Sequence, residues 1–204
     1  MNVKLLTSYN SLLDMEHSTA LATLTCHANT SKDFVPYEVL TRIIKLGHES
    51  ILEHIYLTYS VKGISRALLQ ELARHRHLTL SVESTRHTLR KNLENPDWVR
   101  ETLGNIENPL FRVYVMSACE MLEALIKQYQ EATNDELKYL IPECWPTNLI
   151  MTANVRELRH ILDLRTAPAA LKEFRDLGHA LYEAVPEQFR YLLEDCVHEE
   201  ASHE

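Results

Sequence analysis

Alternating apolar and polar positions predict short strands in the first half of the chain. Residues 55–61 place Ile55, Leu57, Tyr59 and Val61 on one side, the pattern of a half-buried strand that we expect to end at Gly63. Residues 78–83 alternate in the same way. The segment Asn2–Leu6 is a further candidate strand. These runs predict a small sheet.

Most of the remaining chain has apolar positions at helical spacing, with proline and glycine at several boundaries. Pro36 and Gly47, for example, bracket one predicted helix. We expect helices at 12–26, 36–46, 64–73, 110–132 and 147–165, and a last one from Thr166 and Pro168 to Pro186, with a polar break at 96–108. Many helices and few strands predict an α/β (α+β-like) fold with a small antiparallel sheet.

Composition limits the class of protein. A chain of 204 residues with 45% hydrophobic content is long enough for one buried core, so we expect a single domain at 1–198 and a charged tail at 199–204. The net charge of −8 argues against a general nucleic-acid or anionic-membrane binder. No apolar run approaches the roughly 20 residues of a membrane span and no secretory pattern begins the chain, so we expect a cytoplasmic protein.

The strongest local signal is a basic cluster in this acidic chain. Residues 74–86 hold Arg74, Arg76 and Arg86, with two histidines and several hydroxyl side chains among them. Arginine forks and hydroxyls bind phosphate or carboxylate well. The four glycines form no dinucleotide fingerprint or P-loop, so a nucleotide would be held by side chains. The alternative is a polar turn facing water.

The segment His48–His54 contains paired His and Glu residues but lacks zinc spacing, because its two histidines are six apart rather than four on one helix face. A loop contacting a phosphorylated or flat ligand, and a capping box around Ser50 and Glu53, both stay open. We expect no metal site.

The segment Asn154–Arg165 places Arg156 and His160 four apart on one helix face, with Arg165 at the predicted helix end. The alternative is a solvated face whose last arginine complements the helix dipole. No Gly-x-Ser-x-Gly elbow accompanies Ser84, which argues against a serine hydrolase. A histidine-dependent metal hydrolase lacks the ligand spacing.

Together these three segments resemble the flavin-dependent thymidylate synthases. The family motif is Arg-His-Arg, seven residues, then Ser, matched by Arg74-His75-Arg76 and Ser84. His48-Glu49-Ser50, Asn154-Val155-Arg156 and Leu164-Arg165 match further family motifs. The resemblance runs from about residue 3 to Val197.

The resemblance implies helices around a twisted antiparallel sheet, a homotetramer with active sites shared between subunits, and an enzyme that methylates dUMP to dTMP. Methylenetetrahydrofolate would donate the carbon, and FAD would carry reducing equivalents from NADPH. Since none of the four cysteines falls in the basic cluster, we expect no cysteine nucleophile toward uracil.

The resemblance also assigns residues to roles. Arg165 would be catalytic, activating the uracil ring, and His48 would lie at the flavin and folate faces. The positions implied for FAD are Ser50, Arg74, His75, Arg76, Asn154, Val155, Arg156 and His160. Those implied for dUMP are Glu71, Leu72, Ala73, Arg74, Val82, Glu83, Ser84, Thr85, Arg86, Asn148 and Arg165.

The chain departs from the common family pattern at Glu71, at Ser81-Val82, and at His87, Asn148 and Ala169. These departures concern phosphate and folate contacts. A non-catalytic nucleotide- or RNA-binding protein using the same cluster is the alternative, against which the net charge speaks.

Overall fold

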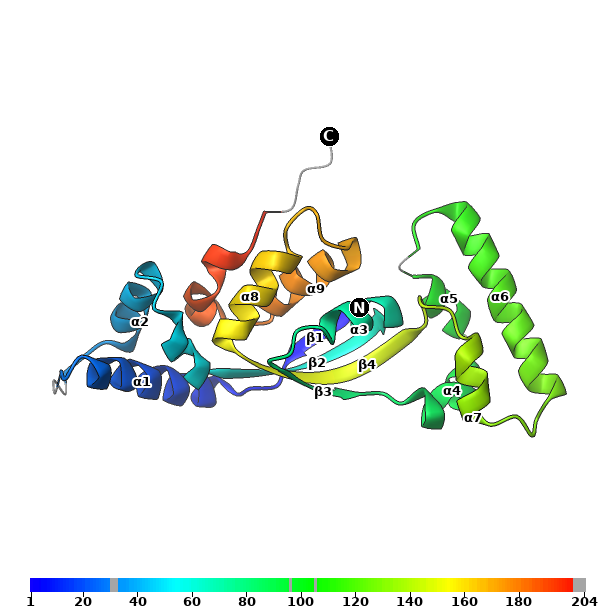
Figure 1. Ribbon diagram of the computed structural model, residues 1–204, viewed down its shortest axis with the longest axis horizontal. Helices are drawn as coiled ribbons and strands as arrows, with labels where there is room; N and C mark the ends of the chain where they lie inside the picture. Colours follow the sequence, from blue (N-terminus) through cyan, green and yellow to red (C-terminus); the bar gives the residue numbers. More distant parts are fainter. Residues whose placement is uncertain (30–32, 96, 105, 200–204) are drawn as a thin grey trace. The chain divides into compact units, whose positions relative to one another are not determined.

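The computed structural model describes residues 1–29, 33–95, 97–104 and 106–199 (Figure 1). Within them, four strands form one antiparallel sheet in the order β1-β2-β4-β3. The small sheet among many helices confirms the predicted fold class. Residues 200–204 of the expected tail lie outside the described part. The strands are β1 (Asn2–Leu5), β2 (Tyr56–Ser65), β3 (Leu78–Val82) and β4 (Pro146–Asn154).

The helices lie between and after the strands. The α-helices are α1 (Tyr9–Cys26), α2 (Pro36–Lys45), α3 (Arg66–Leu72), α4 (Thr85–Leu93), α5 (Trp98–Leu103), α6 (Pro109–Gln128), α7 (Asn134–Leu137), α8 (Val155–Arg165) and α9 (Lys172–Glu183). Short 3-10 helices are η1 (Glu49–His54), η2 (Lys138–Leu140), η3 (Glu187–Leu192) and η4 (Glu194–Cys196).

The chain forms two compact units. Unit 1 contains Met1–Val61, His75–Leu80 and Ile150–Glu204, and unit 2 contains Lys62–Arg74 and Ser81–Leu149. The chain crosses from one unit to the other within β2, β3 and β4.

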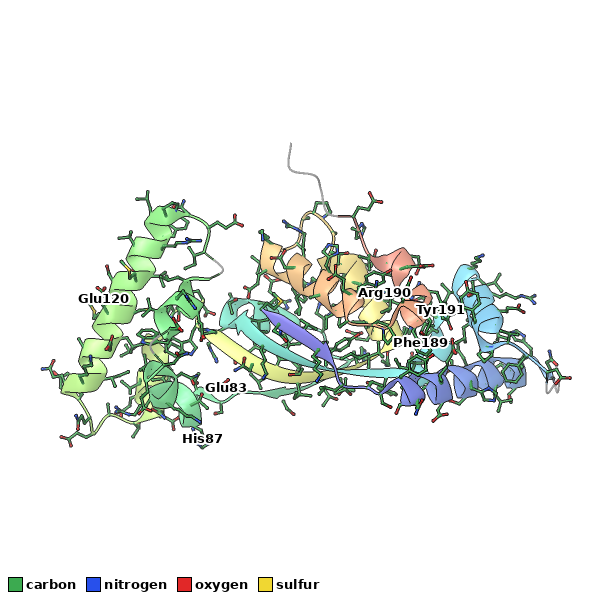
Figure 2. The ribbon with its side chains drawn as sticks, turned by 180° about the vertical axis from the view of Figure 1, so that it is seen from behind. Glu83, His87, Glu120, Phe189, Arg190 and Tyr191 are labelled. Atoms are coloured by element: carbon green, nitrogen blue, oxygen red, sulfur yellow. The ribbon has the colours of Figure 1, made fainter. Side chains whose placement is uncertain are left out.

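In unit 1, α8 packs against η1, α9 and η4, and α9 also packs against β1. Figure 2 labels Phe189 and Tyr191 in η3, which is held to the N-terminal helices by aromatic contacts. The rings of Tyr37 and Tyr191 are 4.7 Å apart. The hydroxyl of Tyr191 also lies 2.6 Å from a carboxylate oxygen of Glu16. The core of this unit includes Leu12, Leu40, Leu52, Ile55, Leu57, Tyr59, Leu158, Ile161, Leu162, Phe174 and Leu177.

In unit 2, α5 packs against α6, and α4 packs against α7. Trp98 and Trp145 meet in a buried cluster with Cys119 and Leu122, their rings 5.4 Å apart. The sequence predicted a polar break at 96–108, and this prediction is wrong where the structure forms the helix α5. This helix forms because burial of Trp98 among these residues outweighs the weak local pattern.

The largest correction concerns residues 147–165, predicted as one helix. The structure has β4 to Asn154 and α8 only from Val155. Thr147, Leu149, Met151 and Ala153 are buried while their neighbours are more exposed, which is the two-residue period of a strand. Asn154 then caps α8, its side chain accepting a 2.8 Å hydrogen bond from the Glu157 amide.

Two boundaries also differ from expectation. Gly63 does not end β2, because its left-handed backbone (φ +72°) is accommodated in the strand and its amide donates to Asn148 Oδ1. Thr166 does not open the last helix. It is the C-cap of α8, and α9 begins at Lys172.

The α8–α9 contact depends on Gly178. A Cβ at this position would lie 2.7 Å from the Thr166 methyl, closer than real contacts allow. The Thr166 hydroxyl is fixed, since it donates to the Leu162 carbonyl and accepts from the His198 amide.

We therefore expect Gly178→Ala to lower the free energy of unfolding by about 1–3 kcal/mol through overpacking. In a Thr166→Ser background, which keeps both hydrogen bonds and removes the methyl, the loss should fall below about 1 kcal/mol or reverse, because alanine is the better helix former. Urea unfolding of the four proteins measures this. An equal loss in both backgrounds would contradict the proposed clash.

Candidate functional site

The β4–α8 junction presents several of the expected flavin residues. Asn154 ends β4 and caps α8, and Val155 begins the helix with a fully buried side chain. Arg156 and His160 are exposed on one face, as the spacing predicted. The opposite side of α8 is buried, which fixes the orientation of the exposed face.

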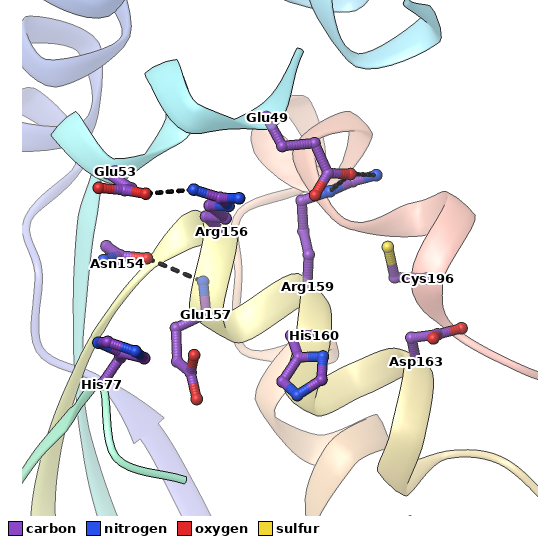
Figure 3. Close-up of a pocket in the computed structure, with 10 residues that line it drawn as sticks. All are labelled: Glu49, Glu53, His77, Asn154, Arg156, Glu157, Arg159, His160, Asp163 and Cys196. Carbon is purple, nitrogen blue, oxygen red and sulfur yellow. Dashed lines mark hydrogen bonds and ion pairs between the residues drawn. The ribbon is translucent and has the colours of Figure 1, made fainter. Parts of the chain in front are cut away.

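A cavity of about 740 Å³ opens beside this junction (Figure 3). Asn154, Arg156 and His160 line it, whereas Ser50, Arg74, His75, Arg76 and Val155 are not among its lining residues in the described chain. His48 is not among them either. The full lining is Glu49, Glu53, His77, Asn154, Arg156, Glu157, Arg159, His160, Asp163 and Cys196.

The arginines of this cavity are paired with carboxylates. Arg156 Nη1 lies 2.5 Å from Glu53 Oε1. The almost fully buried Arg159 bonds Glu49 and Asp195, and it donates to the Leu192 carbonyl. Glu49 and Asp195 lie in η1 and η4, so Arg159 fixes both segments to α8.

The cavity has the size and polar groups of a small-molecule site. Its volume falls in the range of small-molecule sites, and Asn154, Arg156 and His160 offer hydrogen-bond donors to it. The four carboxylates of the lining outnumber its two arginines, so this cavity alone is not a strongly cationic phosphate cradle. Further cations would have to complete it.

The Arg74–His77 segment lies between α3 and β3, as the predicted helix at 64–73 and the predicted strand at 78–83 imply. Arg74 and Arg76 are exposed, and His75 between them is buried. His75 is the one buried residue of this segment, in which residues 74, 76 and 77 form turns with exposed side chains.

The buried His75 ring contacts several residues of unit 1. Arg165 Nε donates a 3.1 Å hydrogen bond to His75 Nε2, and Glu157 Oε1 lies 3.5 Å from Nδ1. The rings of Phe174 and His160 are each 5.9 Å away. Burial, reinforced by the charges of Arg165 and His160, lowers the pKa of His75 to about 4. The ring is therefore neutral at physiological pH.

Because an arginine can only donate, Nε2 of His75 must accept and carries no proton. The neutral ring consequently holds its proton on Nδ1, facing Glu157. Arg165 also lies over the Phe174 ring, its Cζ 4.7 Å from the centroid.

The residues implied for dUMP fall mainly in unit 2. Glu71 and Leu72 end α3, where Ala73 is the C-cap, and Val82 ends β3. Ser84 precedes α4 without using its side chain as a cap, and Thr85 begins the helix. Arg86 pairs with Asp135 at 2.7 Å while its side chain stays largely exposed. Arg165 belongs to unit 1.

Asn148 and Glu83 form a hydrogen-bonded pair beside this segment, and Figure 2 labels Glu83, which precedes α4. Asn148 accepts from the Gly63 amide and donates to Glu83, which also accepts from Asn92. Burial opposes ionisation of Glu83, but the hydrogen bonds from Asn92, Thr88 and Asn148 outweigh it and lower the pKa of this carboxyl. Asn148 thus orients Glu83, and its contact with dUMP stays a prediction.

The alternatives for His48–His54 can be compared with η1. This helix has no side-chain cap, so the capping box around Ser50 and Glu53 is not formed. Among the described residues, no group of three or more His, Cys, Asp or Glu side chains is arranged to hold a metal ion. None of the helices described is both long and apolar enough to cross a membrane.

The residues of the cavity and of the His75 contacts that the sequence did not identify include Glu157, Arg159 and Phe174. The Asn-x-x-Glu spacing from Asn154 is typical of a helix start and could have drawn attention to Glu157. Nothing local could have indicated Phe174, which reaches Arg165 from another helix.

Comparison with known proteins identifies related sequences and structures. The family model described as "Thymidylate synthase complementing protein" matches residues 5–189. The flavin-dependent thymidylate synthase of Helicobacter pylori (strain ATCC 700392 / 26695) is 39% identical over 160 residues, 74% of this chain and 76% of that protein. The corresponding protein of Campylobacter jejuni (strain RM1221) is 38% identical over 164 residues, 76% and 78% of the two chains.

A solved structure extends this similarity to the fold. The crystal structure of the flavin-dependent thymidylate synthase ThyX from Helicobacter pylori, complexed with FAD and dUMP, matches with a TM-score of 0.83 at 34% identity. The match covers 97% of this chain and 100% of that chain.

The buried neutral His75 predicts a pH-dependent stability. Its pKa is lowered in the folded protein to about 4 from 6.5, so between these values the unfolded chain binds a proton that the folded chain does not. Stability is therefore lost as pH falls from 6.5 toward 4. When the pH is lowered from above 6.5 to 4, the free energy of unfolding of the wild type should fall by about 3 kcal/mol more than that of His75→Gln. Urea unfolding across this pH range checks it, and parallel curves for the two proteins would refute the assignment.

Proposed function

The chain belongs to the flavin-dependent thymidylate synthase family, and we propose that it methylates dUMP to dTMP. Methylenetetrahydrofolate donates the carbon, FAD is the bound cofactor, and NADPH is the reductant. One observation carries the proposal: the Arg74-His75-Arg76 motif and Ser84 lie in a chain whose fold matches, over 97% of its length, a relative complexed with FAD and dUMP.

The reaction needs a two-electron reduction. The transferred carbon arrives at the methylene level and leaves as methyl, so NADPH supplies two electrons and the folate departs as tetrahydrofolate. FAD, when bound, supplies the hydride chemistry between these partners. The protein supplies position and charge.

For FAD, we assign Asn154, Arg156 and His160, which line the cavity, together with Ser50, Val155 and the 74–76 segment. The arginines of the cavity are already paired with carboxylates, so binding the diphosphate of FAD requires cations from outside the cavity. Arg74 and Arg76 are exposed and suited to this role. His48 is assigned to the flavin and folate faces.

For dUMP, the start of α4 offers backbone amides and the exposed Arg86 to the phosphate. Ser84 and Thr85 add hydroxyl donors there. Glu71, Leu72, Ala73, Arg74, Val82, Glu83 and Asn148 complete the assignment. Arg165 acts on the uracil ring, stabilising negative charge on its carbonyls.

The cysteines support a mechanism without a thiol nucleophile. Burial raises the pKa of Cys119 to about 11 and that of Cys196 to about 12. Cys196 lines the cavity, yet Arg159 beside it is already paired with carboxylates. Neither thiol has the lowered pKa of an activated nucleophile.

The catalytic assignment predicts the behaviour of Arg165→Ala. The wild-type protein with bound FAD should form dTMP from dUMP, methylenetetrahydrofolate and NADPH. Because the charge on uracil develops in the transition state, Arg165→Ala should lower turnover by about 10²-fold or more and change the apparent dUMP constant less.

Product analysis and steady-state kinetics at saturating folate measure both constants. Wild-type protein that binds nucleotide without flavin absorbance or dTMP would instead favour a non-catalytic binding protein. A variant with intact turnover and only a raised dUMP constant would give Arg165 a binding role.

We further propose a cytoplasmic homotetramer with active sites shared between subunits. The carboxylates that line the cavity outnumber its arginines, and cations from a neighbouring subunit would complete a phosphate site, which supports shared sites. Apolar side chains of α6 also lie exposed, including Leu110, Phe111 and Tyr114.

Shared sites predict complementation between inactive variants. Arg74→Ala and Arg165→Ala proteins, mixed under conditions of subunit exchange, should regain measurable dTMP formation because some sites receive both intact residues. Each variant carried alone through the same treatment is the control. No recovery, with exchange verified by mass spectrometry of labelled subunits, would place both residues in one subunit's site.

A further inference from the structure

We propose that Glu157 and His75 are positioning residues for Arg165: Glu157 fixes the proton on Nδ1 of His75, and Nε2 of His75 then holds the guanidinium of Arg165. The inference rests on the proposed function, in which Arg165 acts on uracil. The resemblance assigns His75 to flavin, whereas the geometry gives its ring this additional role.

The first step is the contact between the guanidinium and the imidazole. Arg165 is the last residue of α8, and His75 reaches it from the segment before β3. The 3.1 Å bond uses the Nε edge of the guanidinium, so it restricts the side-chain torsions and sets the direction of the two terminal nitrogens. A long arginine side chain at a helix end would otherwise sample many rotamers.

The second step is the choice of tautomer. A histidine can accept from Arg165 only while Nε2 is unprotonated, and the neutral ring has two tautomers of similar energy. Glu157 lies 3.5 Å from Nδ1 and is nearly as buried as His75, so its carboxylate favours the Nδ1-protonated form. Glu157 itself is held at the first turn of α8 by the Asn154 cap.

The third step is support from α9. Phe174 is fully buried, and it contacts both the His75 ring and the Arg165 guanidinium. It lies four residues before Gly178, on the same face of α9. Thr166 directly follows Arg165 in the chain. The close approach of Gly178 to Thr166 therefore also brings Phe174 to Arg165.

The test is Glu157→Gln. A glutamine amide can either accept from Nδ1 or donate to it, so it no longer enforces the Nδ1-protonated tautomer that Arg165 requires of His75. We expect turnover at saturating dUMP to fall about 10- to 100-fold, the effect of a misplaced catalytic group, with the dUMP constant within about twofold. The matched control is Glu187→Gln, at an exposed carboxylate in the first turn of η3, and should retain wild-type turnover.

A second readout does not depend on activity. In ¹⁵N-labelled protein, the Nε–H of Arg165, assigned by its loss in Arg165→Lys, should exchange slowly with water in the wild type and at least about tenfold faster in Glu157→Gln. If Glu157→Gln does not fold, His75→Phe keeps the buried ring volume and removes the acceptor, and the same changes are expected.

The outcomes separate the two proposals. Wild-type protein that forms no dTMP would refute the proposed function, and the exchange measurement would then decide the positioning alone. Unchanged turnover in Glu157→Gln would overturn the positioning role, as would lost turnover with unchanged exchange at Arg165. Lost turnover together with faster exchange supports it.

Discussion

Burial of an uncharged histidine between a carboxylate and a guanidinium is the constraint on which the account of this protein depends. His75 can accept from Arg165 only as the neutral Nδ1-protonated tautomer, and its surroundings disfavour the charged form. Arg165 itself takes part in keeping the ring neutral. Arg165 therefore stabilises the neutral form of His75, and the neutral His75 holds the side chain of Arg165. The arginine assigned to uracil is thus fixed by a residue of the motif that the resemblance assigns to flavin.

The β4–α8 junction places the remaining groups around this pair. Asn154 caps α8 at the junction where Arg156, Glu157 and His160 line the cavity, and Glu157 also reaches His75. Arg159 fixes η1 and η4 to the same helix through Glu49 and Asp195. One short helix thus contributes to both the cavity and the Arg165 contact, and it also packs on α9.

Sequence patterns predicted the parts of the fold that are governed by local periodicity. The alternation at 55–61 and 78–83 predicted strands correctly, and the Arg74–His77 segment was correctly placed between a helix and a strand. Residues 147–154 were predicted as helix because their apolar residues fit either period, and only burial in the sheet selects the strand. The roles of Glu157 and Phe174 depend on contacts between distant segments, so no local pattern could indicate them. The expected flavin and dUMP residues were named from resemblance, and their contacts stay predictions.

The tautomer and charge of His75 can be observed directly by ¹⁵N NMR of histidine-labelled protein, with His75 assigned by its absence in a His75→Gln variant. The account predicts a neutral ring with a protonated Nδ1 and an unprotonated Nε2, unchanged from pH 8 to about 5. It also predicts that the Nε2 chemical shift moves in Arg165→Ala, which removes the donor. A ring protonated at Nε2, or one that titrates near its ordinary pKa of 6.5, would contradict the central claim.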